Sequence, residues 1–231
     1  MSIKLLDVSF GYDSYTHLFY HLNLTIPMCC WVTIIGDCGS GKTTLAKLIA
    51  GILTPVSGDI IFSWGDGNSQ KPEFGYLFQN PDDQFVHFNI EREVAFSLEN
   101  VGIARDEMFP RVEESLKNAN LWNRRNDSPN NLSGGEKQRL ALAGMLITEP
   151  KVLILDEPTS FLDIIARAEL YKVTKALLDE KVSIIWITQE PNEINMSDYV
   201  VKLERGKVSH CGESADYVRR YFPKRNSRFE K

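Results

Sequence analysis

The first third of the chain alternates short apolar runs with turn-forming residues, a pattern typical of strands. The strands that it predicts span residues 3–10, 22–26, 31–35, 59–62 and 74–78. The last two enclose the turn-rich segment 64–68. Two later runs, 151–155 and 182–188, are apolar throughout, as in strands that are buried on both faces of a parallel sheet.

Apolar residues at helical spacing predict the helices. One helix starts at Lys42 and ends at Gly51, and another spans residues 134–147. Between residues 90 and 121 the apolar positions also fit helical faces. We therefore expect residues 1–231 to form a single α/β domain, with a helical subdomain inserted at approximately residues 85–130.

Composition narrows the class of protein. The chain has 231 residues, 43% hydrophobic and 25% charged, as in an ordinary globular domain with a sizeable core. A net charge of −5 argues against a broad surface for nucleic acid or anionic lipid. No apolar stretch is long enough to span a membrane and the first residues do not resemble a signal peptide, so we expect any membrane contact to go through a partner. The four cysteines form no C-x-x-C pair, which favours reduced thiols in a cytosolic protein.

A glycine-rich segment directly follows the predicted strand 31–35 and opens the helix at Lys42. It matches the pattern G-x-x-x-x-G-K-[ST], whose glycines let backbone N–H groups face a phosphate chain. Lys42 can reach the β- and γ-phosphates, and the Thr43 hydroxyl can hold Mg²⁺. The strand and helix on either side argue against a chance glycine turn. The candidate ligands of a nucleoside triphosphate are Gly36, Asp37, Cys38, Gly39, Ser40, Gly41, Lys42, Thr43 and Thr44.

Two adjacent carboxylates, Asp156 and Glu157, end the apolar run 151–155. The carboxyl ends of parallel strands are where α/β sheets bind ligands. We expect Asp156 to lie beside Mg²⁺ and Glu157 to orient or deprotonate an attacking water. The alternative, a strand that ends in a solvated acidic turn, is disfavoured by the phosphate-binding pattern upstream.

A helix start with unusual glycines follows Leu132. Ser133 is a good N-cap and Glu136 stands at the capping-box offset, so a helix is expected here whatever its function. Capping does not explain Gly134 and Gly135, because glycine is a poor helix former. Bare N–H groups at a helix start suit an anion, and we expect that anion to be a nucleotide brought by another subunit.

Together these segments resemble the ATP-binding cassette (ABC) ATPases over nearly the whole chain. Residues 36–43 resemble Walker A, residues 132–138 the signature, and residues 152–157 Walker B. Gln79 resembles the Q-loop glutamine, a catalytic and Mg²⁺-binding residue, and Asp163 ends a D-loop. Tyr12 stands where the family places an aromatic ring on adenine, although a core tyrosine is the alternative. The resemblance implies an α/β P-loop NTPase core with an antiparallel β subdomain and an inserted helical subdomain.

The resemblance also implies cofactors and partners. The cofactors are ATP and Mg²⁺, and each ATP lies in a head-to-tail dimer between Walker A of one subunit and Ser133, Gly134 and Gly135 of the other. Residues 78–85 and 91–100 resemble the ATPases of energy-coupling factor and cobalt/nickel importers, which implies a membrane subunit docked near residues 79–100. The alternative is that residues 80–83 are merely a polar turn. The chain is then expected at the cytoplasmic face of the cell membrane, without nucleic acid and without direct insertion.

Departures from the family are informative. Gln189 stands where the family has a switch histidine, and it can donate a hydrogen bond but cannot carry a proton or a charge. Phe161 replaces a small D-loop residue, and Cys29-Cys30 replaces the usual Gly-Glu turn before the P-loop strand. Only a short stretch follows His210, including the basic segment 224–228, so we expect a heterodimer with a second ATPase subunit rather than self-dimerisation through a C-terminal extension.

Other classes of ATPase compete with this interpretation. An ordinary ABC importer or exporter subunit is the main alternative. A DNA-repair ATPase would need heptads between Walker A and the signature, which are absent from the sequence, and translation-associated relatives carry two cassettes in one chain. The solute, a vitamin or a transition-metal ion, cannot be read from an ATPase sequence.

Overall fold

A computed structural model describes residues 1–13, 16–64 and 70–222. The chain divides into two compact units. The first comprises residues 1–70 and 185–231, and the second comprises residues 71–184. In the described part of the chain, no helix combines the length and apolar character that a membrane crossing requires.

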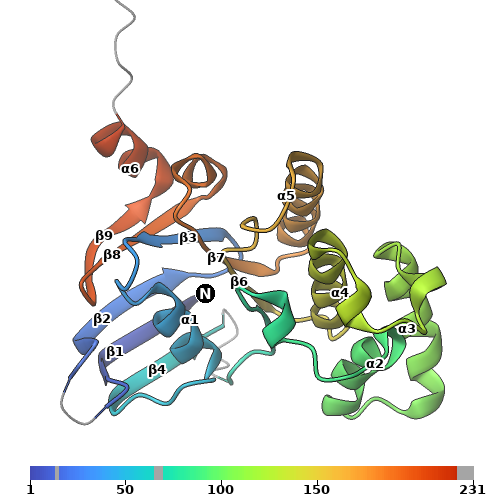
Figure 1. Ribbon diagram of the computed structural model, residues 1–231. Coiled ribbons are helices and arrows are strands. Elements are labelled where there is room, and N and C mark those ends of the chain that lie inside the picture. Colours follow the sequence, from blue (N-terminus) through green and yellow to red (C-terminus); the bar gives the residue numbers. More distant parts are fainter. Residues whose placement is uncertain (14–15, 65–69, 223–231) are drawn as a thin grey trace, which may run out of the picture. The chain divides into compact units, whose positions relative to one another are not determined.

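An antiparallel sheet with the strand order β2-β1-β4 lies in the first unit (Figure 1). Its strands are β1 (Ser2–Phe10), β2 (Phe19–Pro27) and β4 (Ser57–Ser63). In β1 the buried residues alternate until a bulge after Leu5, where Asp7 has φ 55°. The bulge returns Val8 to the buried face, because the side-chain period of two would otherwise expose it. This sheet agrees with the antiparallel β subdomain implied by the family resemblance.

The P-loop strand lies in a second set of strands of the first unit. Strand β3 (Trp31–Gly36) pairs in parallel with β8 (Tyr199–Glu204), which pairs antiparallel with β9 (Lys207–Glu213). Helix α1 (Lys42–Ala50) follows β3, and α6 (Ser214–Tyr221) follows β9. Residues of β3 are buried on both faces, which explains its continuous apolar run.

The second unit contains one parallel strand pair and most of the helices. Strands β5 (Phe74–Leu77) and β6 (Val152–Asp156) pair in parallel. Strand β7 (Ser183–Ile187) begins in this unit and continues into the first. The helices are α2 (Ile90–Asn100), α3 (Arg105–Asn118), α4 (Gly134–Leu146) and α5 (Ile164–Asp179), with short 3₁₀ turns η1 (Pro81–Asp83), η2 (Trp122–Arg124) and η3 (Pro129–Asn131).

Helices α2, α3 and α4 share an apolar core. Ile90, Val94 and Leu98 of α2 meet Leu116 of α3 and Leu140 of α4, all of them almost fully buried. The spacing of the α2 residues, four apart, places them on one helical face, as the sequence pattern predicts. Figure 1 shows these three helices, drawn in green and yellow-green, grouped together.

The observed elements confirm the predicted α/β class, and most differ from their predicted ranges only at the ends. The predicted helical stretch 90–121 is two helices, because a turn at Gly102, with φ 76°, separates α2 from α3. Among the α-helices and strands of the described residues, α5, β8, β9 and α6 were not predicted. Most of the predicted turn at 64–68 and the basic segment 224–228 lie outside the described residues.

Candidate functional site

The glycine-rich loop between β3 and α1 is shaped as an anion cradle. Gly39 and Gly41 have φ 76° and 104°, values that residues with a Cβ rarely adopt. At Gly41, a Cβ would also lie 2.7 Å from the Phe19 ring. Among the described residues no side chain caps α1, and its first turn contains no acidic residue. The first N–H groups of the helix are therefore left to an external acceptor.

Lys42 is held at the centre of this loop. Its side chain is 7% exposed, and its Nζ donates to the carbonyl oxygens of Gly36 and Asp37 at 2.8 and 3.0 Å. A buried ammonium group is costly unless it is paired, and carbonyl dipoles satisfy it only in part. Phosphate oxygens would replace them as stronger, charged acceptors. The loop therefore fits a polyphosphate.

Tyr12 lies at the edge of the same unit. The residue is 68% exposed, its hydroxyl lies 2.9 Å from Thr44 Oγ1, and its ring meets the Phe10 ring edge-on at a centroid distance of 5.1 Å. This exposure contradicts the alternative that Tyr12 is a core residue. A ring that is anchored at its hydroxyl and open on a face can stack on a base.

The two carboxylates at the end of β6 have different environments. Asp156 is 2% exposed, and its Oδ2 accepts from the Tyr76 hydroxyl at 3.3 Å. Glu157 is half-buried, and its Oε2 accepts from Gln79 Nε2 at 2.9 Å. Glu157 also has φ 46°, a strained backbone value of the kind that clusters at functional sites. The structure thus brings Glu157 and Gln79 together, as two predicted catalytic residues.

The start of α4 is capped by its own side chains. The Ser133 hydroxyl accepts from Glu136 N at 3.4 Å, and Glu136 Oε2 accepts from Ser133 N at 2.9 Å, which is the predicted capping box. The glycines beside it are not required by the chain's own packing. A Cβ would meet nothing closer than 3.7 Å at Gly134 or 3.9 Å at Gly135. Packing within the described residues therefore does not account for the two glycines.

Comparison with known proteins decides the family. Residues 19–160 match the family described as ABC transporter. The energy-coupling factor transporter ATP-binding protein EcfA1 of Ligilactobacillus salivarius is 40% identical over 218 residues, which is 91% of this chain and 77% of that protein. This chain is an ABC transporter ATPase. The predicted family and the predicted ATP-hydrolysing activity are confirmed.

Solved structures agree with the assignment of this ABC ATPase. The structure of cbiO1 from Clostridium perfringens, described as part of the ABC transporter complex cbiONQ, has a TM-score of 0.77 and 30% identity, and covers 96% of this chain and 95% of that one. MJ0796, a bacterial ABC transporter cassette solved as a dimer, has a TM-score of 0.80 and 25% identity, and covers 92% of this chain and 98% of that one. The predicted fold is thereby confirmed.

The predicted D-loop residue of the ABC ATPase has a clear local function. Asp163 is the N-cap of α5, where its Oδ1 accepts from Ala166 N at 2.8 Å. Phe161, just before it, is 57% exposed. Gln138, which was not predicted as a site residue, is buried, and its Nε2 donates to the Pro158 carbonyl at 2.9 Å. This bond ties the signature helix to the segment after Glu157.

Gln189, the predicted substitute for the switch histidine, is exposed two residues after the end of β7. The segment after it is anchored by a buried pair, because Trp186 Nε1 donates to Glu193 Oε2 at 2.8 Å. The buried Trp31 ring supports Trp186 at a centroid distance of 4.9 Å. The ABC ATPase therefore places Gln189 on a well-supported turn of the first unit.

Proposed function

We propose that this ABC ATPase is one of two ATPase subunits of an energy-coupling factor type importer of a vitamin or a transition-metal ion. In this proposal the subunit lies at the cytoplasmic face of the membrane and docks on an integral membrane partner. The observation that carries the proposal is a groove beside residues 78–85 and 91–100, the segments that resemble energy-coupling factor ATPases. A subunit of an ordinary ABC importer or exporter remains the alternative.

The groove has a volume of about 410 Å³ and belongs to the second unit. Gln84 and Phe85 line it, together with Phe96 and Val101 from α2 and its end, and Leu140 from α4. Val101 is 42% exposed, and Phe88, in the same segment, is 87% exposed. The lining is mixed, because Glu93 and Asn100 also line the groove. A groove with apolar and polar walls and exposed hydrophobic residues beside it suits an amphipathic helix.

An ion pair connects this segment to the signature helix. Asn80 caps η1 by accepting from Asp82 N at 3.3 Å, so residues 80–83 do form a polar turn. Asp82 Oδ1 in turn lies 2.6 Å from Nζ of Lys137, which follows the signature glycines in α4. A partner that displaces η1 would therefore pull directly on α4. This connection favours a function in which the turn at residues 80–83 transmits movement between the membrane partner and α4.

Glycines at the start of α4 support a head-to-tail dimer. Their bare backbone, which this chain's own packing does not require, suits the close approach of a partner's triphosphate to Ser133, Gly134 and Gly135. The MJ0796 cassette was solved as a dimer. We propose that the partner here is a second, non-identical ATPase, because Gln189 leaves this chain without the switch histidine.

The remaining assignments are proposals that follow from the chemistry of the side chains. Thr43, Gln79 and Asp156 supply oxygen donors of the kind that Mg²⁺ prefers, and Mg²⁺ would neutralise charge on the phosphates. Glu157 would hold the attacking water, with Gln79 orienting Glu157 through their hydrogen bond. Residues 85–130 would form the inserted helical subdomain, and α4, which follows this range, completes its apolar core.

A charge placed in the groove tests the docking proposal. Val101→Glu should abolish copurification of the membrane subunit, because a carboxylate would have to be desolvated on docking. ATP binding by the subunit should survive. Phe109→Glu is the matched control, since Phe109 is 54% exposed in α3 and does not line the groove. Equal copurification of the Val101 variant and wild type would contradict the proposal.

An added methyl group tests the dimer proposal. Gly135→Ala should leave thermal stability unchanged or raise it, because alanine is favoured over glycine in helices by up to about 1 kcal/mol. ATP turnover of the assembled complex should nevertheless fall. Full turnover in the Gly135 variant would contradict a close approach at this helix start.

A further inference from the structure

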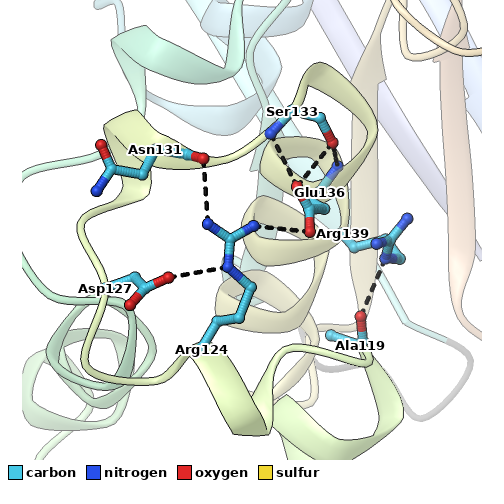
Figure 2. Close-up of polar contacts among 7 residues, drawn as sticks. All are labelled: Ala119, Arg124, Asp127, Asn131, Ser133, Glu136 and Arg139. Atoms are coloured by element: carbon cyan, nitrogen blue, oxygen red, sulfur yellow. Dashed lines mark hydrogen bonds and ion pairs between the residues drawn. The ribbon is translucent and has the colours of Figure 1, made fainter.

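Arg124 makes three directed contacts in the second unit, shown in Figure 2. Its Nε donates to Asp127 Oδ2 at 2.9 Å, its Nη1 to Glu136 Oε1 at 2.9 Å, and its Nη2 to the Asn131 carbonyl at 3.1 Å. The side chains of Arg124 and Glu136 are only 34% and 24% exposed. A guanidinium group held by three acceptors is fixed in orientation, unlike one in a lone surface ion pair.

Glu136 connects Arg124 to the signature serine. While Oε1 accepts from Arg124, Oε2 accepts from Ser133 N at 2.9 Å and from Ser133 Oγ at 2.8 Å. Figure 2 shows the Glu136 carboxylate between the Arg124 guanidinium and Ser133. The hydroxyl proton of Ser133 is thus directed at Glu136. Arg124 is connected to this proton through one intermediate side chain.

The same contacts keep Glu136 ionised. Hydrogen bonds from the backbone N–H and then the hydroxyl of Ser133, together with Arg124, lower the pKa of Glu136 to about 2. A permanent negative charge therefore lies at the helix start where, in the proposed dimer, a partner's triphosphate arrives. Without compensation this charge would repel the phosphates.

We propose that Arg124 is a positioning residue that prepares the start of α4 for the triphosphate bound by a second ATPase subunit. It fixes the Glu136 carboxylate against Ser133, and it offsets the negative charge of that carboxylate. A compensated carboxylate is also a weaker acceptor, so Ser133 Oγ–H can turn from Glu136 to a phosphate oxygen. This inference rests on the proposed head-to-tail function of Ser133.

Substitutions that separate charge from structure test the proposal. In the assembled complex, Arg124→Gln should raise the KM for ATP about tenfold, the size expected for loss of one charge-assisted hydrogen bond, with a smaller change in kcat. Affinity of the isolated full-length chain for ATP should not change. Arg125→Gln is the matched control, because Arg125 Nη1 donates to the Trp122 carbonyl at 3.2 Å within its own turn, where its guanidinium stacks on the Trp122 ring.

The double variant Arg124→Gln/Glu136→Gln should return the KM to near the wild-type value. A neutral amide at position 136 can still accept from Ser133 and leaves no charge to offset. Arg124→Lys, which keeps the charge but not the three-way geometry, should give an intermediate KM and covers the case in which Arg124→Gln fails to fold.

Two results would overturn the proposal: an unchanged KM in both Arg124 variants, or no rescue by Glu136→Gln. Ser133→Ala separates this failure from failure of the dimer proposal. If Ser133→Ala raises the KM while the Arg124 variants do not, only the positioning role of Arg124 is wrong. If Ser133→Ala also leaves the KM unchanged, the proposed approach of a partner's triphosphate is itself wrong.

Discussion

Two helices of this ABC ATPase begin with glycines, yet their starts are built in opposite ways. At α1 the glycines adopt left-handed conformations, no described side chain caps the helix, and a buried Lys42 bonds to backbone carbonyls. At α4 the glycines are ordinary helical residues, and Ser133 and Glu136 close a complete capping box. The first start leaves its own polar groups for a ligand, while the second satisfies two of its backbone N–H groups, those of Ser133 and Glu136, internally.

The difference indicates what each start binds. An uncapped helix with a lysine beside it needs an anion to complete it, so α1 can hold a triphosphate within this chain. The α4 start is stable without a ligand, because its cap is complete and Arg124 offsets the charge of Glu136. At Gly134 and Gly135, the backbone of this start is open to the approach of another molecule. We infer that α4 serves a nucleotide that another molecule delivers.

The largest expected effect comes from Glu157→Gln. Loss of the base should lower ATP turnover of the complex by roughly 10²- to 10⁴-fold, while the phosphate cradle at α1 remains intact. The variant should therefore still bind ATP. The α1 start of one subunit and the α4 start of the other should stay on the same ATP for longer, so the dimer should persist. Steady-state turnover and ATP-dependent dimerisation measure this, and normal turnover would contradict the role of Glu157.

Lys42→Ala should have the next largest effect, and it affects α1 only. Removing the charge-assisted contact to the phosphates should cost about 2 kcal/mol or more in ATP affinity, or roughly 30-fold. Isothermal calorimetry on the isolated chain checks this. Thermal stability should change little, because Lys42 bonds to loop carbonyls and not to the core. Wild-type affinity in this variant would exclude a P-loop role for Lys42.

Gln189→His should produce a smaller change. A neutral amide stabilises developing charge on a phosphate less than an imidazolium group does, so histidine should raise turnover by a factor on the order of tenfold or less. Removing the switch residue of the partner subunit should be more damaging than removing Gln189. The proposed difference between the two ATP sites of the dimer would be contradicted if Gln189→Ala lowered ATP turnover as much as Glu157→Gln.

The smallest effect is a pH dependence of stability at the α4 cap. The pKa of Glu136 is lowered from 4.5 to about 2, so its stabilising contribution is complete above pH 4.5 and is lost as the pH falls towards 2. The difference in unfolding free energy between wild type and Glu136→Gln should therefore shrink over this range. Acid titration of chemical unfolding for both proteins measures it, and a difference that does not depend on pH would contradict the ion pair.

Local patterns explain what the sequence could predict. The P-loop, the strand that ends at Asp156 and the capping box are each encoded in a few consecutive residues, and the structure has all three. Helix α5 was not predicted because only Leu170 and Thr174 are buried in it, which leaves little apolar periodicity. Strand β9 does alternate between exposed and partly buried positions, but its partly buried residues are Val208, His210 and Gly212, so the sequence shows no apolar alternation.

Residues that act through side-chain contacts were also beyond prediction. Arg124 reaches Asp127, Asn131 and Glu136 from the short 3₁₀ turn η2, and a turn of three residues has no periodicity that could indicate which residues meet. Strand β2 begins earlier than its apolar run because Phe19 is buried although Tyr20 and His21 after it are exposed. Its pairing with β1 shows a register shift there, and His21 has φ 51°.

The central claim is that α1 holds a nucleotide within this chain whereas α4 acts on one held by another subunit. Ser133→Ala tests it most directly, with ATP affinity measured on the isolated chain by calorimetry and ATP turnover measured on the assembled complex. We expect the affinity to stay within about twofold of wild type and the turnover to fall about tenfold or more, as for loss of a hydrogen bond to a charged group. The claim would be contradicted if Ser133→Ala weakened ATP binding by the isolated chain as much as Lys42→Ala, or left the turnover of the complex unchanged.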